Sequence, residues 1–199
     1  MQEPKPSCLL LVISGPGGVG KDTVIERLKG LDPNLRSSVS FTTRARREYE
    51  LDDVHYTFVT VPRFHELIGR DELLEHAFVN GHYYGTSKTR VEKLQRAGHD
   101  VILTIEVRGA NQVREKRPDG IFFFITPPSM EDLMVRRHQR GAESEEEMEQ
   151  RQRLAEWEIS HAEFYDHVVV NDDVDRVARE ILEIVNRERR LRRPGSDSR

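Results

Sequence analysis

The sequence predicts an α/β fold in which helices cover a parallel β-sheet. Apolar runs alternate with helical patterns along most of the chain, as they do in successive strand and helix units. The apolar runs are short and continuous, which is typical of strands buried on both faces. The length of 199 residues fits one domain, or one core with inserted subdomains.

Four apolar runs predict the core strands, at residues 8–14, 100–106, 121–126 and 167–171. A glycine-rich loop follows the first run, and residues 23–31 then have a helical pattern. A final amphipathic helix is expected from residue 174 to about residue 191, where the chain becomes rich in arginine. These elements together form the predicted core.

The stretch from about residue 37 to residue 90 has a different character. Its strands alternate in hydropathy, as in residues 55–59, and its turns are rich in tyrosine. Alternation predicts a half-exposed antiparallel sheet, so this stretch is interpreted as an inserted subdomain. Its helix is expected at residues 62–70, with Phe64, Leu67 and Ile68 on one face.

A second insertion follows the third core strand. Ser129 is expected to cap a helix that runs toward Arg140 and Gly141. The next helix, residues 144–164, begins with three consecutive glutamates. Acidic residues suit the positive end of a helix dipole, and this explains the acidic run most simply.

The composition excludes several classes of protein. There are 31 Lys and Arg residues against 35 Asp and Glu residues, and the resulting net charge of −4 argues against a dedicated nucleic-acid binder. No stretch approaches the roughly 18 apolar residues of a membrane-spanning helix, and no targeting segment is evident, so a cytoplasmic protein is expected. Cys8 is the single cysteine, which excludes an internal disulfide.

Residues 15–21 match the phosphate-loop pattern of glycine, four residues, glycine and lysine. The loop lies between a predicted strand and a predicted helix, where backbone N–H groups and the helix dipole bind phosphate oxygens. Lys21 is expected to bridge the outer phosphates of a nucleoside triphosphate. The residues expected to contact ATP here are Gly15, Pro16, Gly17, Gly18, Val19, Gly20, Lys21, Asp22 and Thr23.

Asp22 departs from that pattern. It occupies the position at which a serine or threonine usually donates a hydroxyl to magnesium, and Thr23 comes one residue later. Two interpretations stay open from the residues alone. Asp22 is either an altered metal contact, acting through a water, or an acid at the first position of the helix.

Seven segments occur in an order and spacing that resembles the guanylate kinases. They are GPGGVGK (15–21), SVSFTTR (38–44), GHYYGTS (81–87), RGA (108–110), PPS (127–129), RG (140–141) and VVVNDD (168–173). The resemblance implies a phosphate-loop kinase with a three-layer α/β core and a parallel sheet (7–37, 91–128 and 156–191). It also implies a mixed α/β GMP-binding subdomain (38–90), a helical lid (129–155) and a flexible tail (192–199).

The chemistry of GMP agrees with the residues at the matching positions. Its phosphate needs cations and hydroxyl donors, and guanine needs a carboxylate for N1–H and the 2-amino group together with a hydroxyl donor for O6. The phosphate contacts are expected from Arg44, Arg47, Tyr56 and Tyr84, and the guanine contacts from Glu75, Ser40 and Thr86.

The resemblance also implies a metal contact, a set of catalytic cations and an adenine contact. Glu106 stands where the family commonly has an aspartate and is expected near GMP and magnesium, with Asp22 as the other candidate metal contact. Phosphoryl transfer depends mainly on positioning and on neutralising charge. The expected catalytic cations are Lys21, Arg44 and the lid arginines Arg137, Arg140 and Arg151, and the expected adenine contact is Asn171.

The function expected from these residues is transfer of the γ-phosphate of ATP to GMP, and to dGMP, with Mg²⁺, in purine nucleotide metabolism. The chain is expected to act as a monomer or a homodimer on small molecules alone. One alternative is a ribose 1,5-bisphosphate phosphokinase, which Asp22 favours and which Ser40, Glu75 and Thr86 oppose. Another is a phosphopeptide-binding module without catalysis, which has no need of the intact loop or of the lid arginines.

Overall fold

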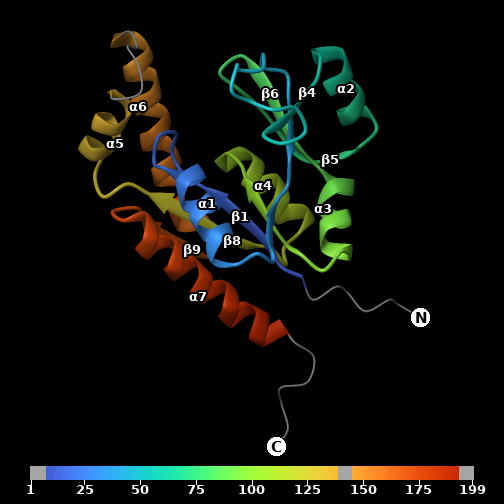
Figure 1. The fold of residues 1–199 in the computed structure, drawn as a ribbon. Helices are drawn as coiled ribbons and strands as arrows, with labels where there is room; N and C mark the ends of the chain where they lie inside the picture. The colour runs from blue at the N-terminus through green and yellow to red at the C-terminus, as the bar shows by residue number, and fades with distance from the viewer. Residues whose placement is uncertain (1–7, 139–144, 193–199) are drawn as a thin grey trace, which may run out of the picture. The chain divides into compact units, whose positions relative to one another are not determined.

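The structure is a computed structural model that describes residues 8–138 and 145–192 (Figure 1). Its strands are β1 (Leu10–Ser14), β2 (Leu35–Ser37), β3 (Ser40–Thr42), β4 (Tyr56–Phe58), β5 (Leu73–Val79), β6 (His82–Ser87), β7 (Asp100–Thr104), β8 (Ile121–Thr126) and β9 (His167–Val170). Its helices are α1 (Lys21–Leu31), α2 (Val61–Gly69), α3 (Lys88–Arg96), α4 (Val107–Lys116), α5 (Met130–His138), α6 (Glu145–Ser160) and α7 (Val174–Arg192).

The strands form two sheets, and the predicted α/β class is confirmed. One sheet has the strand order β2-β7-β1-β8-β9 and the other has the order β4-β3-β6-β5. The chain divides into two compact units, which are described in turn. Unit 1 is Met1–Leu11 with Arg36–Gly120, and unit 2 is Val12–Leu35 with Ile121–Arg199.

Unit 2 carries the two strands β8 and β9 and the paired helices α1 and α7. β8 is buried from Ile121 to Ile125, as its continuous apolar run predicts, and it pairs in parallel with β9. α7 packs beside α1 (Figure 1) and buries Val177, Ala178, Ile181 and Val185 on one face. The amphipathic pattern of α7 therefore determines how this helix packs.

Unit 1 contains the smaller sheet, whose strands are not all antiparallel. β6 pairs antiparallel with β3 and with β5, but β3 and β4 are parallel, with Ser40 opposite Tyr56 and Thr42 opposite Phe58. The prediction of a wholly antiparallel sheet is wrong for this pair. A parallel pair needs a connection of about a dozen residues or more, and residues 43–55 supply it.

Three helix boundaries differ from the predicted ones. α1 begins at Lys21, two residues earlier than expected, because Gly20 takes the left-handed N-cap conformation. α2 begins at Val61, after Thr60 has accepted a hydrogen bond from the Arg63 N–H group. α6 ends at Ser160 and is followed by a 3₁₀ turn, Ala162–Phe164, because the Ser160 hydroxyl bonds the Trp157 carbonyl.

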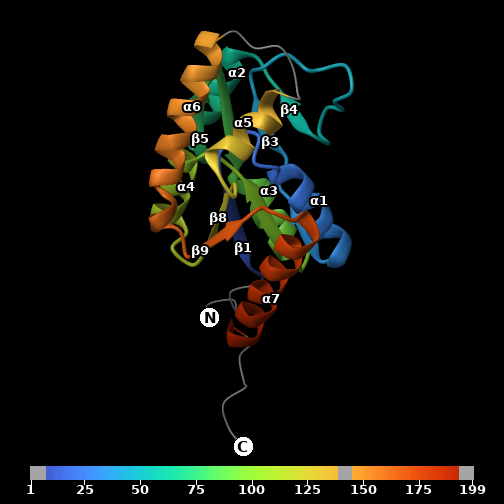
Figure 2. The ribbon, with the colours of Figure 1, turned by 90° about the vertical axis from the view of Figure 1, so that its left-hand side faces the viewer.

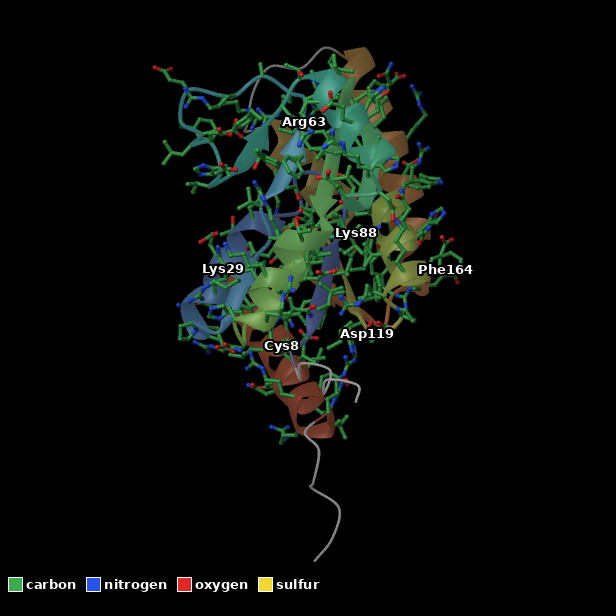
Figure 3. The ribbon with its side chains drawn as sticks, turned by 90° about the vertical axis from the view of Figure 1, so that its right-hand side faces the viewer. Cys8, Lys29, Arg63, Lys88, Asp119 and Phe164 are labelled. Carbon is green, nitrogen blue, oxygen red and sulfur yellow. The ribbon has the colours of Figure 1, made fainter. Side chains whose placement is uncertain are left out.

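The expected start of α5 is confirmed. The backbone N–H of Asp132 donates to the Ser129 hydroxyl at 3.0 Å, so Ser129 caps α5 as predicted. Lys88, which is labelled in Figure 3, is the first residue of α3, and it donates a hydrogen bond to the Asp71 carboxylate. Within residues 8–138 and 145–192, no helix has the length and apolarity needed to cross a membrane.

We expect Ile181→Ala to lower the free energy of unfolding by about 3 kcal/mol, because a fully buried aliphatic side chain leaves a cavity between α7 and α1. Urea denaturation followed by circular dichroism measures this change. Glu183→Ala, on the exposed face of the same helix, should stay within about 0.5 kcal/mol of the wild type. Equal losses of unfolding free energy in the two variants would contradict the assignment of Ile181 to the buried face of α7.

Candidate active site

The phosphate loop of unit 2 needs glycine for two different reasons. At Gly15 a Cβ atom would lie 2.1 Å from the carbonyl oxygen of Ile125, so the loop passes directly against the backbone of β8 and no side chain fits. Gly18 and Gly20 have φ values of +88° and +96°, which L side chains rarely adopt. The predicted strand, loop and helix arrangement is confirmed.

Lys21 occupies the first position of α1, and its ammonium group turns back to the loop. It donates to the carbonyl oxygens of Gly15 and Pro16, the latter at 3.3 Å. Asp22 follows at the second helical position rather than the first, and both Asp22 and Thr23 are exposed. An exposed first-turn carboxylate suits either of the two roles that the sequence left open for Asp22.

Asn171 connects the end of β9 to the phosphate loop. Its side-chain Nδ2 donates to the Val19 carbonyl at 2.7 Å, and the residue is 2 % exposed. Its Oδ1 is buried and accepts no hydrogen bond from any residue that the structure describes. A buried amide oxygen without a donor is costly, so this atom is available to a ligand that brings one.

Arg136 is a residue of this region that the sequence analysis missed. Its guanidinium donates to the Asn171 carbonyl at 3.0 Å and to the Val19 carbonyl at 3.4 Å. It lies on α5 directly before Arg137. The sequence offered no signal to prefer one arginine of this pair, because neighbouring residues on a helix point in directions about 100° apart and the direction of the loop was unknown.

The catalytic roles of the three lid arginines stay predictions. Arg137 lies in α5, but its side chain is outside the described part of the structure. Arg140 falls in the segment 139–144, which is also outside the described residues. Arg151 lies on the exposed surface of α6.

Unit 1 contains a cavity of about 200 Å³ at the smaller sheet. Five of the residues predicted to contact GMP line it, and the other lining residues come from β5, β6, the turn between these strands and the end of β7 with the segment after it. The five predicted residues are Ser40, Tyr56, Glu75, Tyr84 and Glu106. The structure therefore brings together side chains that lie up to 66 positions apart in the sequence.

Glu75 is the most strongly perturbed group of this cavity. The carboxylate is 3 % exposed, and burial raises the pKa of Glu75 to about 7. The Thr86 hydroxyl donates to its Oε1 at 2.6 Å and opposes that rise in pKa, as does the charge of Lys116. Thr86, predicted to meet guanine directly, is itself fully buried and here holds Glu75 in place.

Arg44 and Arg47 converge on a carboxylate that the sequence analysis missed. Arg44 forms a bidentate pair with Glu50, at 2.7 and 2.9 Å, and lies over the ring of Tyr56 at 5.5 Å. The backbone N–H of Arg47 donates to the same carboxylate at 2.8 Å. Hydrogen bonds from Arg44 lower the pKa of Glu50 to about 2 despite its burial. Glu50 is a single buried acid in a loop of exposed, charged residues, so no motif or periodicity in the sequence distinguishes it from its neighbours.

Glu106 stands at the N-cap of α4 and lines the cavity, but its side chain makes no capping hydrogen bond. Across residues 8–138 and 145–192, no group of three or more His, Cys, Asp or Glu side chains is placed to hold a metal ion. Magnesium bound with a nucleotide needs only one or two carboxylates besides phosphates and waters. Asp22 and Glu106 therefore fit such an ion as single contacts.

Comparison with known proteins identifies the family of this chain. The family model described as "Guanylate kinase" matches residues 7–188. A guanylate kinase of Desulfitobacterium hafniense is 46% identical over 166 residues, which cover 83% of each chain. One from Rhizobium meliloti is 45% identical over 94% of this chain and 87% of its own.

A solved structure gives the same result. The crystal structure of guanylate kinase from Anaplasma phagocytophilum has a TM-score of 0.74 and 34% identity, over 93% of this chain and 88% of that one. The range matched by the family model, residues 7–188, contains the phosphate loop and the residues that line the cavity of unit 1. The chain therefore belongs to the guanylate kinase family.

Proposed function

We propose that this protein transfers the γ-phosphate of ATP to GMP and releases ADP and GDP. Membership in the guanylate kinase family supports the reaction and both substrates. The observation that carries the proposal is the buried carboxylate of Glu75, which accepts a hydrogen bond from the Thr86 hydroxyl and lines the cavity of unit 1 together with Ser40. Neither alternative function gains support from the comparisons.

On the donor side, the loop binds the triphosphate of ATP. The backbone N–H groups of residues 15–20 and the N-terminus of α1 offer positive potential to the phosphate oxygens, and Lys21 supplies a full charge. The adenine amino group is the donor that the buried Oδ1 of Asn171 lacks. When it is bound, Mg²⁺ neutralises phosphate charge, and Asp22 and Glu106 would hold it through water.

On the acceptor side, Glu75 accepts hydrogen bonds from guanine N1–H and the 2-amino group, and Ser40 donates to O6. The GMP phosphate meets Arg44, Arg47, Tyr56 and Tyr84. Arg44 is already fixed by Glu50, so less side-chain entropy is lost when the phosphate arrives. dGMP presents the same base edge and the same phosphate, and we propose it as a second acceptor.

The residues proposed to act during transfer are cations. Lys21 and Arg44 neutralise the two ends of the reacting array, and Arg137, Arg140 and Arg151 neutralise the transferring phosphoryl group. Residues 129–155 form the proposed lid, which excludes water so that phosphate passes to GMP and not to solvent. Residues 38–90 form the proposed GMP-binding subdomain, and the protein is proposed to act in the cytoplasm.

We expect Glu75→Gln to lower kcat/KM for GMP by about 100-fold, since the amide cannot accept from both guanine donors. ADP release is measured with GMP, AMP and ribose 1,5-bisphosphate offered separately. Glu72→Gln, at a half-buried position three residues earlier, is the matched control and should leave turnover unchanged. Turnover with the ribose bisphosphate but not with GMP would contradict the proposal.

The raised pKa of Glu75 predicts a pH-dependent KM for GMP. Only the ionised carboxylate accepts from both guanine donors, and its ionised fraction falls about tenfold between pH 8 and pH 6 when the pKa is about 7. We expect KM for GMP to rise by about the same factor, measured at saturating ATP. Because the GMP phosphate titrates near pH 6 as well, Glu75→Gln is the control, and it should show a clearly smaller rise.

The same raised pKa predicts that Glu75→Gln stabilises the protein above pH 7. The unfolded chain releases this proton near pH 4.5 and the folded chain near pH 7, so stability falls as pH rises through that window. We expect the variant to gain about 2–3 kcal/mol at pH 8 and much less at pH 4.5, measured by urea denaturation. An equal gain at both pH values would show that the gain has another cause.

A further inference from the structure

Side chains of α4 form hydrogen bonds with the backbone of β5 along the edge that faces away from β6. β5 is the last strand of its sheet, so its backbone groups on the side away from β6 need partners elsewhere. Gln112 of α4 supplies two: its Nε2 donates to the His76 carbonyl at 2.8 Å, and its Oε1 accepts from the His76 N–H at 3.1 Å. Lys116 donates to the Leu74 carbonyl at 2.7 Å. Figure 2 shows α4 close to β5.

These three hydrogen bonds fall on the residues directly before and after Glu75. Gly109, on the same helix, lies against the Glu75 side chain itself. A Cβ atom at Gly109 would lie 2.4 Å from Glu75 Oε2 and 3.1 Å from its carboxyl carbon. Gly109, Gln112 and Lys116 are spaced by three and four positions, so they share one face of the helix, which we call the α4 face.

We propose that the α4 face positions the carboxylate of Glu75 for guanine and so sets the preference of the enzyme for GMP over nucleotides that lack the 2-amino group. This inference rests on the proposed function of Glu75. Gln112 and Lys116 act through the backbone on both sides of Glu75, and Gly109 acts by leaving room for the side chain. All three are positioning residues, because none of them lines the cavity.

A different element restricts the position of each carboxylate oxygen of Glu75. Oε1 accepts from Thr86 on β6, while Oε2 lies over Gly109 on α4. Hydrogen bonds weaken steeply outside a donor to acceptor distance of about 2.7–3.2 Å, so a shift of a few tenths of an ångström decides whether guanine N1–H and the 2-amino group are both reached. Lys116 and Glu106 are the charged groups near this carboxylate, and they act on it in opposite directions.

The first test replaces Gln112 with leucine, a side chain of similar size that cannot hold the β5 backbone. We expect Gln112→Leu to lower the ratio of kcat/KM for GMP to that for IMP about tenfold, because hypoxanthine has no 2-amino group to lose. KM for ATP should stay within twofold. Asn111→Leu changes the adjacent amide, which is exposed on the same helix, and should leave the ratio unchanged.

A second test separates positioning from loss of folding. Alanine favours a helix over glycine by about 1 kcal/mol, so Gly109→Ala gains helix propensity while its methyl group displaces Glu75. We expect the GMP to IMP ratio to fall while the melting temperature changes little. Lys116→Met should lower the ratio, and Lys116→Arg should restore it because arginine also donates to the Leu74 carbonyl.

The outcomes of these tests distinguish the positioning role of the α4 face from the proposed guanine-binding role of Glu75. If Glu75→Gln lowers the GMP to IMP ratio while Gln112→Leu and Gly109→Ala do not, the α4 face has no positioning role and the proposed function stands. If Glu75→Gln leaves the GMP to IMP ratio unchanged, Glu75 does not recognise guanine. That outcome would contradict both the proposed role of Glu75 and this inference. A fall in all three variants, with Asn111→Leu unchanged, supports both.

Discussion

In the proposed function, the acceptor half of this protein depends on one constraint, which is that the carboxylate of Glu75 must stay charged while it is buried. Burial alone raises the pKa of Glu75 and so favours its neutral form, which cannot accept hydrogen bonds from both guanine donors. Two neighbours oppose that tendency: the Thr86 hydroxyl at 2.6 Å and the positive charge of Lys116. The ionised carboxylate therefore costs folding stability at this position, and in the proposed function that cost is offset by discrimination between bases.

The donor half depends on close approach of backbone segments. The loop lies so near β8 that Gly15 has no room for a Cβ atom, and the Val19 carbonyl accepts from both Asn171 and Arg136. Asn171, directly after β9, and Arg136 of α5 thus hold the loop that leads into α1. In the proposed function the loop binds phosphate through its own N–H groups, so fixing its backbone orders these donors before any phosphate arrives.

Local features of this chain were predictable from its sequence, whereas features set by distant partners were not. The phosphate loop, the buried run of β8 and the face of α7 follow from motif and periodicity within a few residues. Glu50, Arg136 and Gln112 escaped notice because arginines, acids and amides are frequent here, and only the fold selects the one that meets a partner. The parallel pairing of β3 and β4 escaped for a related reason, since a strand's direction depends on the path of the loop before it.

The position of Lys21 affects how the loop selects among anions. Its ammonium group already donates to two carbonyl oxygens of the loop, and charged hydrogen bonds of this kind are worth about 1.5–3 kcal/mol each. An incoming anion must compete with those internal acceptors before it gains from the lysine. A short anion such as inorganic phosphate offers few oxygens in exchange, whereas a triphosphate offers many along its length. In the proposed function, the internal hydrogen bonds of Lys21 therefore weaken the binding of a small anion proportionally more than the binding of a triphosphate.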